Sequence, residues 1–161
     1  MDFQAFKLNA TEFAVKELAI LAPGGSTSHF VFKAPCNWGD LPLSQRCENV
    51  WLTHNHLKIR WDDGDTPYEE IENVLRSNLS SASAVVYVKG EQKAKWLRRY
   101  IEHVVKEIDE KCPALPNLRS HWTNENSCKF HRKPYGPCAL KHVILMERWL
   151  RVHRPCLERS L

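Results

Sequence analysis

Thr66-Pro67-Tyr68-Glu69 and, further along the chain, Ala84-Val85-Val86-Tyr87-Val88 decide the fold class, because they predict a helix that leads into a buried strand. Thr66 can cap the helix, Pro67 suits its first position, and Glu69 completes a capping box. The uninterrupted apolar run at 84–88 is typical of a buried strand. A helix and a buried strand in succession indicate an α/β protein.

The chain on either side of this unit continues the same order of elements. Apolar patterns predict strands at 3–8, 13–21, 30–33 and 104–108, a short helix after Gly90, and a last helix from Ala139 to Val152. Pro155 is expected to end that helix, and no period holds over residues 44–61. We therefore predict an α/β fold with one mixed β-sheet flanked by α-helices, in a single domain of residues 1–152 followed by a tail of residues 153–161.

Composition limits the class of protein further. The chain has 161 residues, of which 43% are apolar, which is enough for the core of one domain. Its longest apolar run, Leu18 to Ala22, is far shorter than the ~20 residues that cross a bilayer. No signal peptide opens the sequence, so we expect an intracellular protein without a membrane partner. The net charge of +4 permits contact with nucleic acid but does not require it.

The densest chemical signal is Cys128-Lys129-Phe130-His131 followed by Cys138. Six cysteines in an intracellular protein are more often core residues or metal ligands than disulfides. Two thiolates and an imidazole at this spacing suit tetrahedral zinc, and the alternative is two buried thiols beside a surface imidazole. The spacing leaves the fourth ligand open among His121, Cys112, Cys156 and a distant acid.

These residues also carry a resemblance to a family. Phe13-Ala14-Val15-Lys16-Glu17-Leu18-Ala19-Ile20, together with Cys128-x2-His131 and Pro137-Cys138-Ala139-Leu140-Lys141-His142, resembles the DnaQ-like (DEDD) exonucleases, which have an RNase H-like fold. The nearest likeness is to the Maelstrom domain, and a more distant one is to the exonuclease domain of arenavirus nucleoproteins. Both have a Glu-Cys-His-Cys zinc site, so the resemblance implies a structural Zn²⁺ held by Glu17, Cys128, His131 and Cys138.

The departures from the nuclease pattern imply a lost catalytic centre. DEDD enzymes hold two metal ions with four carboxylates. Here the first strand offers Asp2-Phe3-Gln4 or Gln4-Ala5-Phe6 where Asp-x-Glu is expected. The helix after the buried strand places Lys93 or its neighbours at the second acid, and His142 stands at the last. Pro137 replaces the catalytic histidine. Since cations cannot replace carboxylates around Mg²⁺, we expect no catalysis by the usual route.

Basic residues mark the candidate nucleic-acid surface. Trp96 and Tyr100, whose rings could stack on bases, lie among the first group of them. The candidates are Lys89, Lys93, Lys95, Arg98, Arg99, Lys129, Arg132 and Lys133. The alternative is a solvated helix face with its aromatic rings packed inward.

Two smaller groups have simpler interpretations. Asp62, Asp63 and Asp65 could bind a hard cation, but a turn that caps the next helix explains them better. His54 and His56 could share one face of a strand, although surface imidazoles are the simpler explanation.

The expected function is a catalytically degenerate RNase H-like module that binds RNA, single-stranded nucleic acid or a protein. The resemblance points to transposon silencing of the piRNA type. A nuclease that cleaves single-stranded RNA at a non-DEDD site is one alternative. A pure adaptor in a silencing or chromatin complex is the other.

Overall fold

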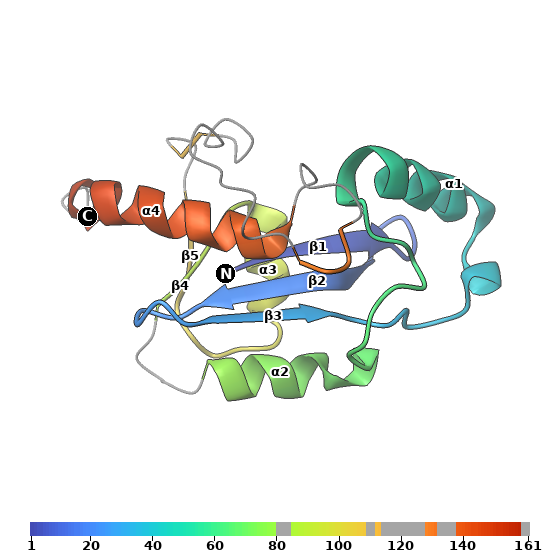
Figure 1. Ribbon diagram of the computed structural model, residues 1–161, viewed down its shortest axis with the longest axis horizontal. Helices are drawn as coiled ribbons and strands as arrows, with labels where there is room; N and C mark the ends of the chain where they lie inside the picture. The colour runs from blue at the N-terminus through green and yellow to red at the C-terminus, as the bar shows by residue number, and fades with distance from the viewer. Residues whose placement is uncertain (80–84, 109–111, 114–127, 132–137, 159–161) are drawn as a thin grey trace.

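The computed structural model describes residues 1–79, 85–108, 112–113, 128–131 and 138–158, which form a mixed α/β structure (Figure 1). An antiparallel sheet has the order β1-β2-β3, and a parallel pair joins β4 to β5. The strands are β1 (Asp2–Lys7), β2 (Phe13–Leu21), β3 (Thr27–Val31), β4 (Val86–Val88) and β5 (Val105–Glu107).

The expected single mixed sheet is therefore two hydrogen-bonded sheets within the described ranges. Met1 N donates to Tyr87 O at 2.9 Å, which brings the start of β1 beside β4. The hydrogen-bonded ladder does not extend from β1 to β4, because β4 and β5 are each three residues long and pair with each other.

A β-bulge in β2 decides which way its side chains face. Gln4 pairs with Glu17 and Ala5 with Val15, so Lys16 has no partner on β1. Val15 and Leu18 consequently share the face that packs on the main core, although regular alternation would place them on opposite faces. Glu17 faces the other way. Lys16 is buried, and its ammonium donates to Phe32 O at 2.8 Å and Trp61 O at 2.6 Å.

Helices cover both faces of the antiparallel sheet, as Figure 1 shows with α4 above the strands and α2 below them. α2 and α3 contribute Leu75 and Leu97 to the core that contains Phe3 and Phe32. α4 packs on the opposite face, where Ala139 and Val143 contact Ala19. The helices are α1 (Leu43–Leu52), α2 (Ile71–Asn78), α3 (Glu91–Leu97) and α4 (Ala139–Glu158), and none in the described ranges is long and apolar enough to cross a membrane.

Two predicted helix ends are wrong. A 3-10 turn (Tyr68–Glu70) precedes α2, so Thr66 makes no cap, and its backbone instead bridges to Phe32. α4 continues through Pro155 to Glu158 rather than ending at Val152, so residues 153–158 of the expected tail are helical. Proline removes one hydrogen-bond donor, but its fixed φ is compatible with a helix.

The region without a readable period, residues 44–61, contains α1 and a π-helical turn at Thr53–Leu57. His54 and His56 lie in that turn and are exposed, so the expected strand is wrong and the interpretation as surface imidazoles holds. Asn49 anchors α1 to the sheet because its side chain accepts from Lys7 N and donates to Lys7 O, both at 2.8 Å.

Candidate metal centre

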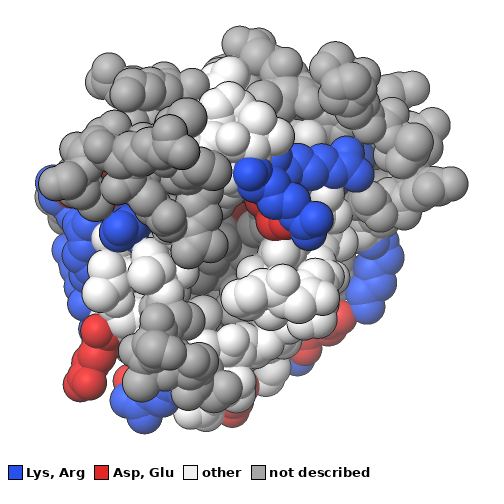
Figure 2. Space-filling view, turned by 90° about the vertical axis from the view of Figure 1, so that its left-hand side faces the viewer, with Lys and Arg blue, Asp and Glu red and all other residues white. Residues whose placement is uncertain are grey.

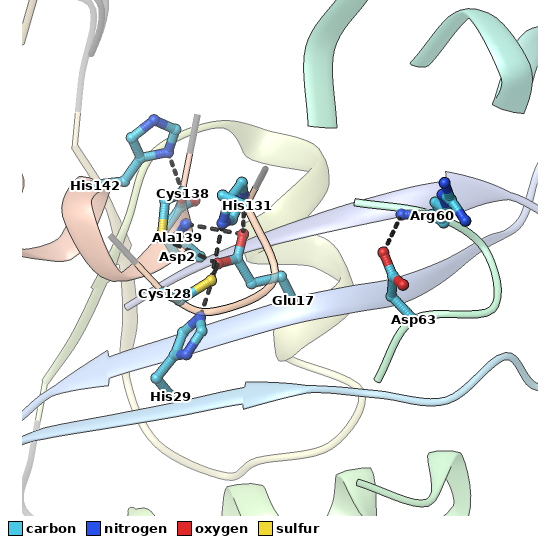
Figure 3. A network of polar contacts seen from close by, with 10 residues as sticks. All are labelled: Asp2, Glu17, His29, Arg60, Asp63, Cys128, His131, Cys138, Ala139 and His142. Carbon is cyan, nitrogen blue, oxygen red and sulfur yellow. Dashed lines mark hydrogen bonds and ion pairs between the residues drawn. The ribbon is translucent and has the colours of Figure 1, made fainter. Parts of the chain in front are cut away.

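Three separate segments meet on the face of the antiparallel sheet that α4 covers. Glu17 extends from β2, Cys138 directly precedes α4, and Cys128 and His131 lie on one short turn (Figure 3). The bulge at Lys16 aims Glu17 at this place, and Ala139 N at the start of α4 donates to Glu17 Oε2 at 3.0 Å. A carboxylate is stabilised there because the N-terminus of a helix carries partial positive charge.

Polar atoms of the four residues lie between 2.8 and 3.9 Å from one another in the pairs that contact. Around tetrahedral zinc with bonds of about 2.0–2.3 Å, neighbouring donors are roughly 3.3–3.8 Å apart. Glu17 Oε1 lies 3.2 Å from Cys138 Sγ and 3.9 Å from Cys128 Sγ. Glu17 Oε2 lies 3.6 Å from His131 Nε2, and His131 Nδ1 lies 2.8 Å from Cys128 Sγ. The structure thus brings Glu17, Cys128, His131 and Cys138 together.

His29 is a functional residue that the sequence analysis missed. Its Nε2 lies 2.7 Å from Glu17 Oε1, and Glu17, His29, Cys128 and Cys138 offer ligand atoms that all lie within 4.8 Å of one another. This group could bind a metal ion. The signal was present in the β2–β3 register, because Glu17 pairs with Val31 and places His29 diagonally beside it on the same face.

The electrostatics of the cluster favour a cation at its centre. Contact with the Cys128 thiol, and then burial, raises the pKa of Cys138 to about 12. Burial alone would lower the pKa of His29, but hydrogen bonds to Cys138 and Glu17 raise it to about 9. The buried His131 Nε2 has no hydrogen-bond partner among the described residues. One bound cation would stabilise both thiolates and satisfy this nitrogen, so the donor set fits a metal ion.

Of the other ligands considered for the fourth position, the structure describes the side chain of Cys112 alone, and it lies outside this cluster. Cys112 is buried with Ile108, Met146 and Trp149 in another part of the core. His121 lies outside the described residues, as does the side chain of Cys156.

A second polar cluster lies on the same side of the sheet. Asp2 is fully buried and forms ion pairs with Lys93 and with His142, whose Nδ1 lies 2.7 Å from Asp2 Oδ2. Burial alone would raise the pKa of Asp2, but the charge of Lys93 and the hydrogen bond with His142 lower it to about 2. Asp2 therefore meets Lys93 and His142, the two bases that stand where the nuclease pattern expects carboxylates, so a single acid lies between two bases.

The predicted basic residues do not form one free surface. Lys89 donates to Cys112 O at 2.6 Å, Lys95 and Arg98 lie near Glu91, and Lys129 pairs with Asp65 at 2.8 Å. Arg99 is exposed, whereas Arg132 and Lys133 lie outside the described residues. Figure 2 shows a face on which described basic side chains stand in separate groups, with acidic ones among them, around a central hollow.

The aromatic and acidic side chains near these bases have structural partners. Trp96 is buried, and its ring lies 4.8 Å from that of Phe3 and 4.6 Å from that of Tyr100, so it packs inward. Asp63 Oδ2 accepts from Arg60 N at 2.8 Å (Figure 3). That bond supports the interpretation of residues 62–65 as a turn.

Comparisons of the chain with protein-family models, with curated proteins and with solved structures found no match. The fold and the site together define a mixed α/β protein with a Glu-His-Cys cluster that could bind a metal ion.

Proposed function

We propose that this chain is an RNase H-like domain, held together by a structural zinc ion and lacking a two-metal catalytic centre, that binds single-stranded RNA. Glu17, Cys128, His131 and Cys138 are the zinc ligands. His29 lies outside this set and orients Glu17 through their 2.7 Å contact, as outer residues do in many zinc sites. The strand order β3-β2-β1, with β4 beside the start of β1, supports the proposed fold.

One observation carries the zinc proposal. Donor atoms from a strand, a turn and a helix start, far apart in the chain, lie 3.2–3.9 Å from the carboxylate oxygens of Glu17. Structural zinc contributes ~10–16 kcal/mol in small peptides, which is comparable to the ~5–15 kcal/mol net stability of a whole domain. A zinc ion here would fix the turn at 128–131 and the start of α4 to β2.

The cluster at Asp2 supports the absence of two-metal catalysis. Its carboxylate is already paired with Lys93 and His142, and the ammonium of Lys93 would repel a divalent cation. Hard cations such as Mg²⁺ require oxygen ligands, which lysine and histidine do not supply.

Elemental analysis of the purified protein tests the zinc proposal. About one zinc per chain is expected, with loss of zinc and of thermal stability in Cys128→Ser and in Cys138→Ser. Cys47→Ser is the matched control because Cys47 is exposed on α1, and it should retain zinc. Stoichiometric zinc in both site variants, or none in the wild type when zinc is supplied during expression, would overturn the proposal.

Binding of RNA rests on the net charge of +4 and on the exposed Lys95 and Arg99 of the α3 region. Fluorescence anisotropy with a labelled single-stranded RNA should give an affinity that falls steeply as salt rises, because phosphate contacts release counterions. No binding at low salt would favour the protein adaptor. Cleavage of the RNA with Mg²⁺ or Mn²⁺, abolished in Lys93 or His142 variants, would favour the nuclease.

A further inference from the structure

Asp2, Lys93 and His142 come from three different elements and form one polar cluster. Asp2 lies on β1, Lys93 on α3 and His142 on α4. The Asp2 side chain is 0% exposed, whereas those of Lys93 and His142 are 30% and 12% exposed. The carboxylate is therefore the buried part of the cluster, and the two bases are partly exposed to solvent.

Each base retains a donor that Asp2 does not use. The ammonium of Lys93 has three N–H groups, and the ion pair with Asp2 engages one carboxylate oxygen. His142 directs Nδ1 at the other carboxylate oxygen, and in the imidazolium form its Nε2–H is a second donor. The buried carboxylate thus sets the orientation of both bases.

The cluster has more N–H donors than its single carboxylate engages. Lys93 brings three N–H groups and the His142 imidazolium two, whereas Asp2 accepts one contact from each base. Gln4, two residues from Asp2 on the same face of β1, has a buried Nε2 without a hydrogen-bond partner among the described residues. The excess is of N–H donors, which suits an oxyanion.

We propose that Lys93 Nζ and His142 Nε2 together bind a phosphate group, with Asp2 as the residue that positions both. Charge-assisted N–H···O bonds to phosphate are among the stronger hydrogen bonds in proteins. The site itself stands on this geometry alone. The source of the phosphate, the end or the backbone of a single-stranded RNA, rests on the proposed function.

Titration of the zinc-loaded full chain with inorganic phosphate tests the site. The ¹H–¹⁵N signals of the His142 ring should shift saturably with phosphate and not with chloride at equal ionic strength. Lys93→Met and His142→Gln should each weaken binding by about tenfold, since a charge-assisted hydrogen bond contributes ~1.5–3 kcal/mol. Lys93→Arg should retain binding. Arg76→Met, at an exposed cation on α2, should change it less than about twofold.

Thermal unfolding of every variant separates loss of the site from loss of the fold. If Lys93→Met fails to fold, Lys93→Arg and His142→Gln decide the question. No saturable shift of the wild-type His142 signals would overturn the proposal, and so would equal binding by wild type and by folded Lys93→Met and His142→Gln. A purely structural ion cluster would give those results.

RNA oligonucleotides with and without a terminal phosphate then identify the source. If the phosphorylated RNA binds more tightly and His142→Gln removes that difference, the site binds a terminal phosphate. If both RNAs bind equally and His142→Gln weakens both, the site binds the backbone. If inorganic phosphate binds and neither RNA does, the site stands and the proposed RNA function fails. If RNA binds equally to wild type, Lys93→Met and His142→Gln, the RNA function stands and the phosphate site fails.

Discussion

Asp2→Asn tests how much the buried ion cluster contributes to the stability of the fold. The side chain is fully buried, and its pKa falls from the ordinary 3.8 to about 2 in the folded protein. Each pKa unit corresponds to 1.36 kcal/mol, so the ionised carboxylate stabilises the fold by about 2 kcal/mol. Asn has nearly the same shape but no charge, and we expect it to lose that amount at pH 7.

The sign of the pH dependence follows from the lowered pKa. A carboxylate with a depressed folded pKa contributes all of its stability above the unfolded pKa and loses it as pH falls from about 4 to about 2. The difference in the free energy of unfolding between wild type and Asp2→Asn should therefore stay constant from pH 7 to pH 5. It should shrink only below about pH 4.

Urea unfolding at matched zinc content, from pH 7 downward, measures this difference. Glu48→Gln, on the exposed side of α1, is the control and should change stability by less than about 0.5 kcal/mol. A double-mutant cycle with His142→Asn should give a coupling of roughly 1 kcal/mol. The reasoning is refuted if Asp2→Asn matches wild type at pH 7, or if the difference has already vanished at pH 5.

Three further substitutions address the packing around the bulge, each measured by urea unfolding. Gly64→Ala should cost at least about 2 kcal/mol, because its φ is +125° and a Cβ would stand 2.4 Å from Phe32 O, whereas Gly24→Ala meets no atom within 4 Å and should be near neutral. Equal stability of these two variants would contradict the strain argument. Lys16→Met should lower the free energy of unfolding by ~1–3 kcal/mol, because it leaves buried carbonyls without a donor. A stabilised variant would show that burying the ammonium costs more than its hydrogen bonds contribute. Leu97→Ala should cost ~2–5 kcal/mol by opening a cavity in the main core, and a loss below 1 kcal/mol would mean that the site collapses.

The strands and the α/β class could be predicted because their residues carry local patterns. β2 (Phe13–Leu21) falls at the predicted residues, and β5 (Val105–Glu107) lies within the predicted run. α1 could not be predicted, since Leu43, Val50 and Trp51 are exposed on it and conceal the period that a buried face would give.

The candidate site was predictable in part for the same physical reason. Cys128, His131 and Cys138 are close in the chain, so their spacing indicates a common ligand. Glu17 was named only through the family resemblance, because no local pattern relates it to residues more than a hundred positions away. His29 depends on the register of a hairpin, which a sequence alone does not fix.

The bulge at Lys16 links the core to the candidate metal centre. In a regular strand Glu17 would share a face with Val15 and enter the apolar core, where an unpaired carboxylate is costly. The extra residue turns Glu17 toward the thiols and the start of α4 while it keeps Leu18 in the core with Val15. The ammonium of Lys16, the extra residue, donates to the carbonyls of Phe32 and Trp61, so this buried charge has hydrogen-bond partners. A single irregularity in β2 therefore satisfies the apolar packing on one face and the donor cluster on the other.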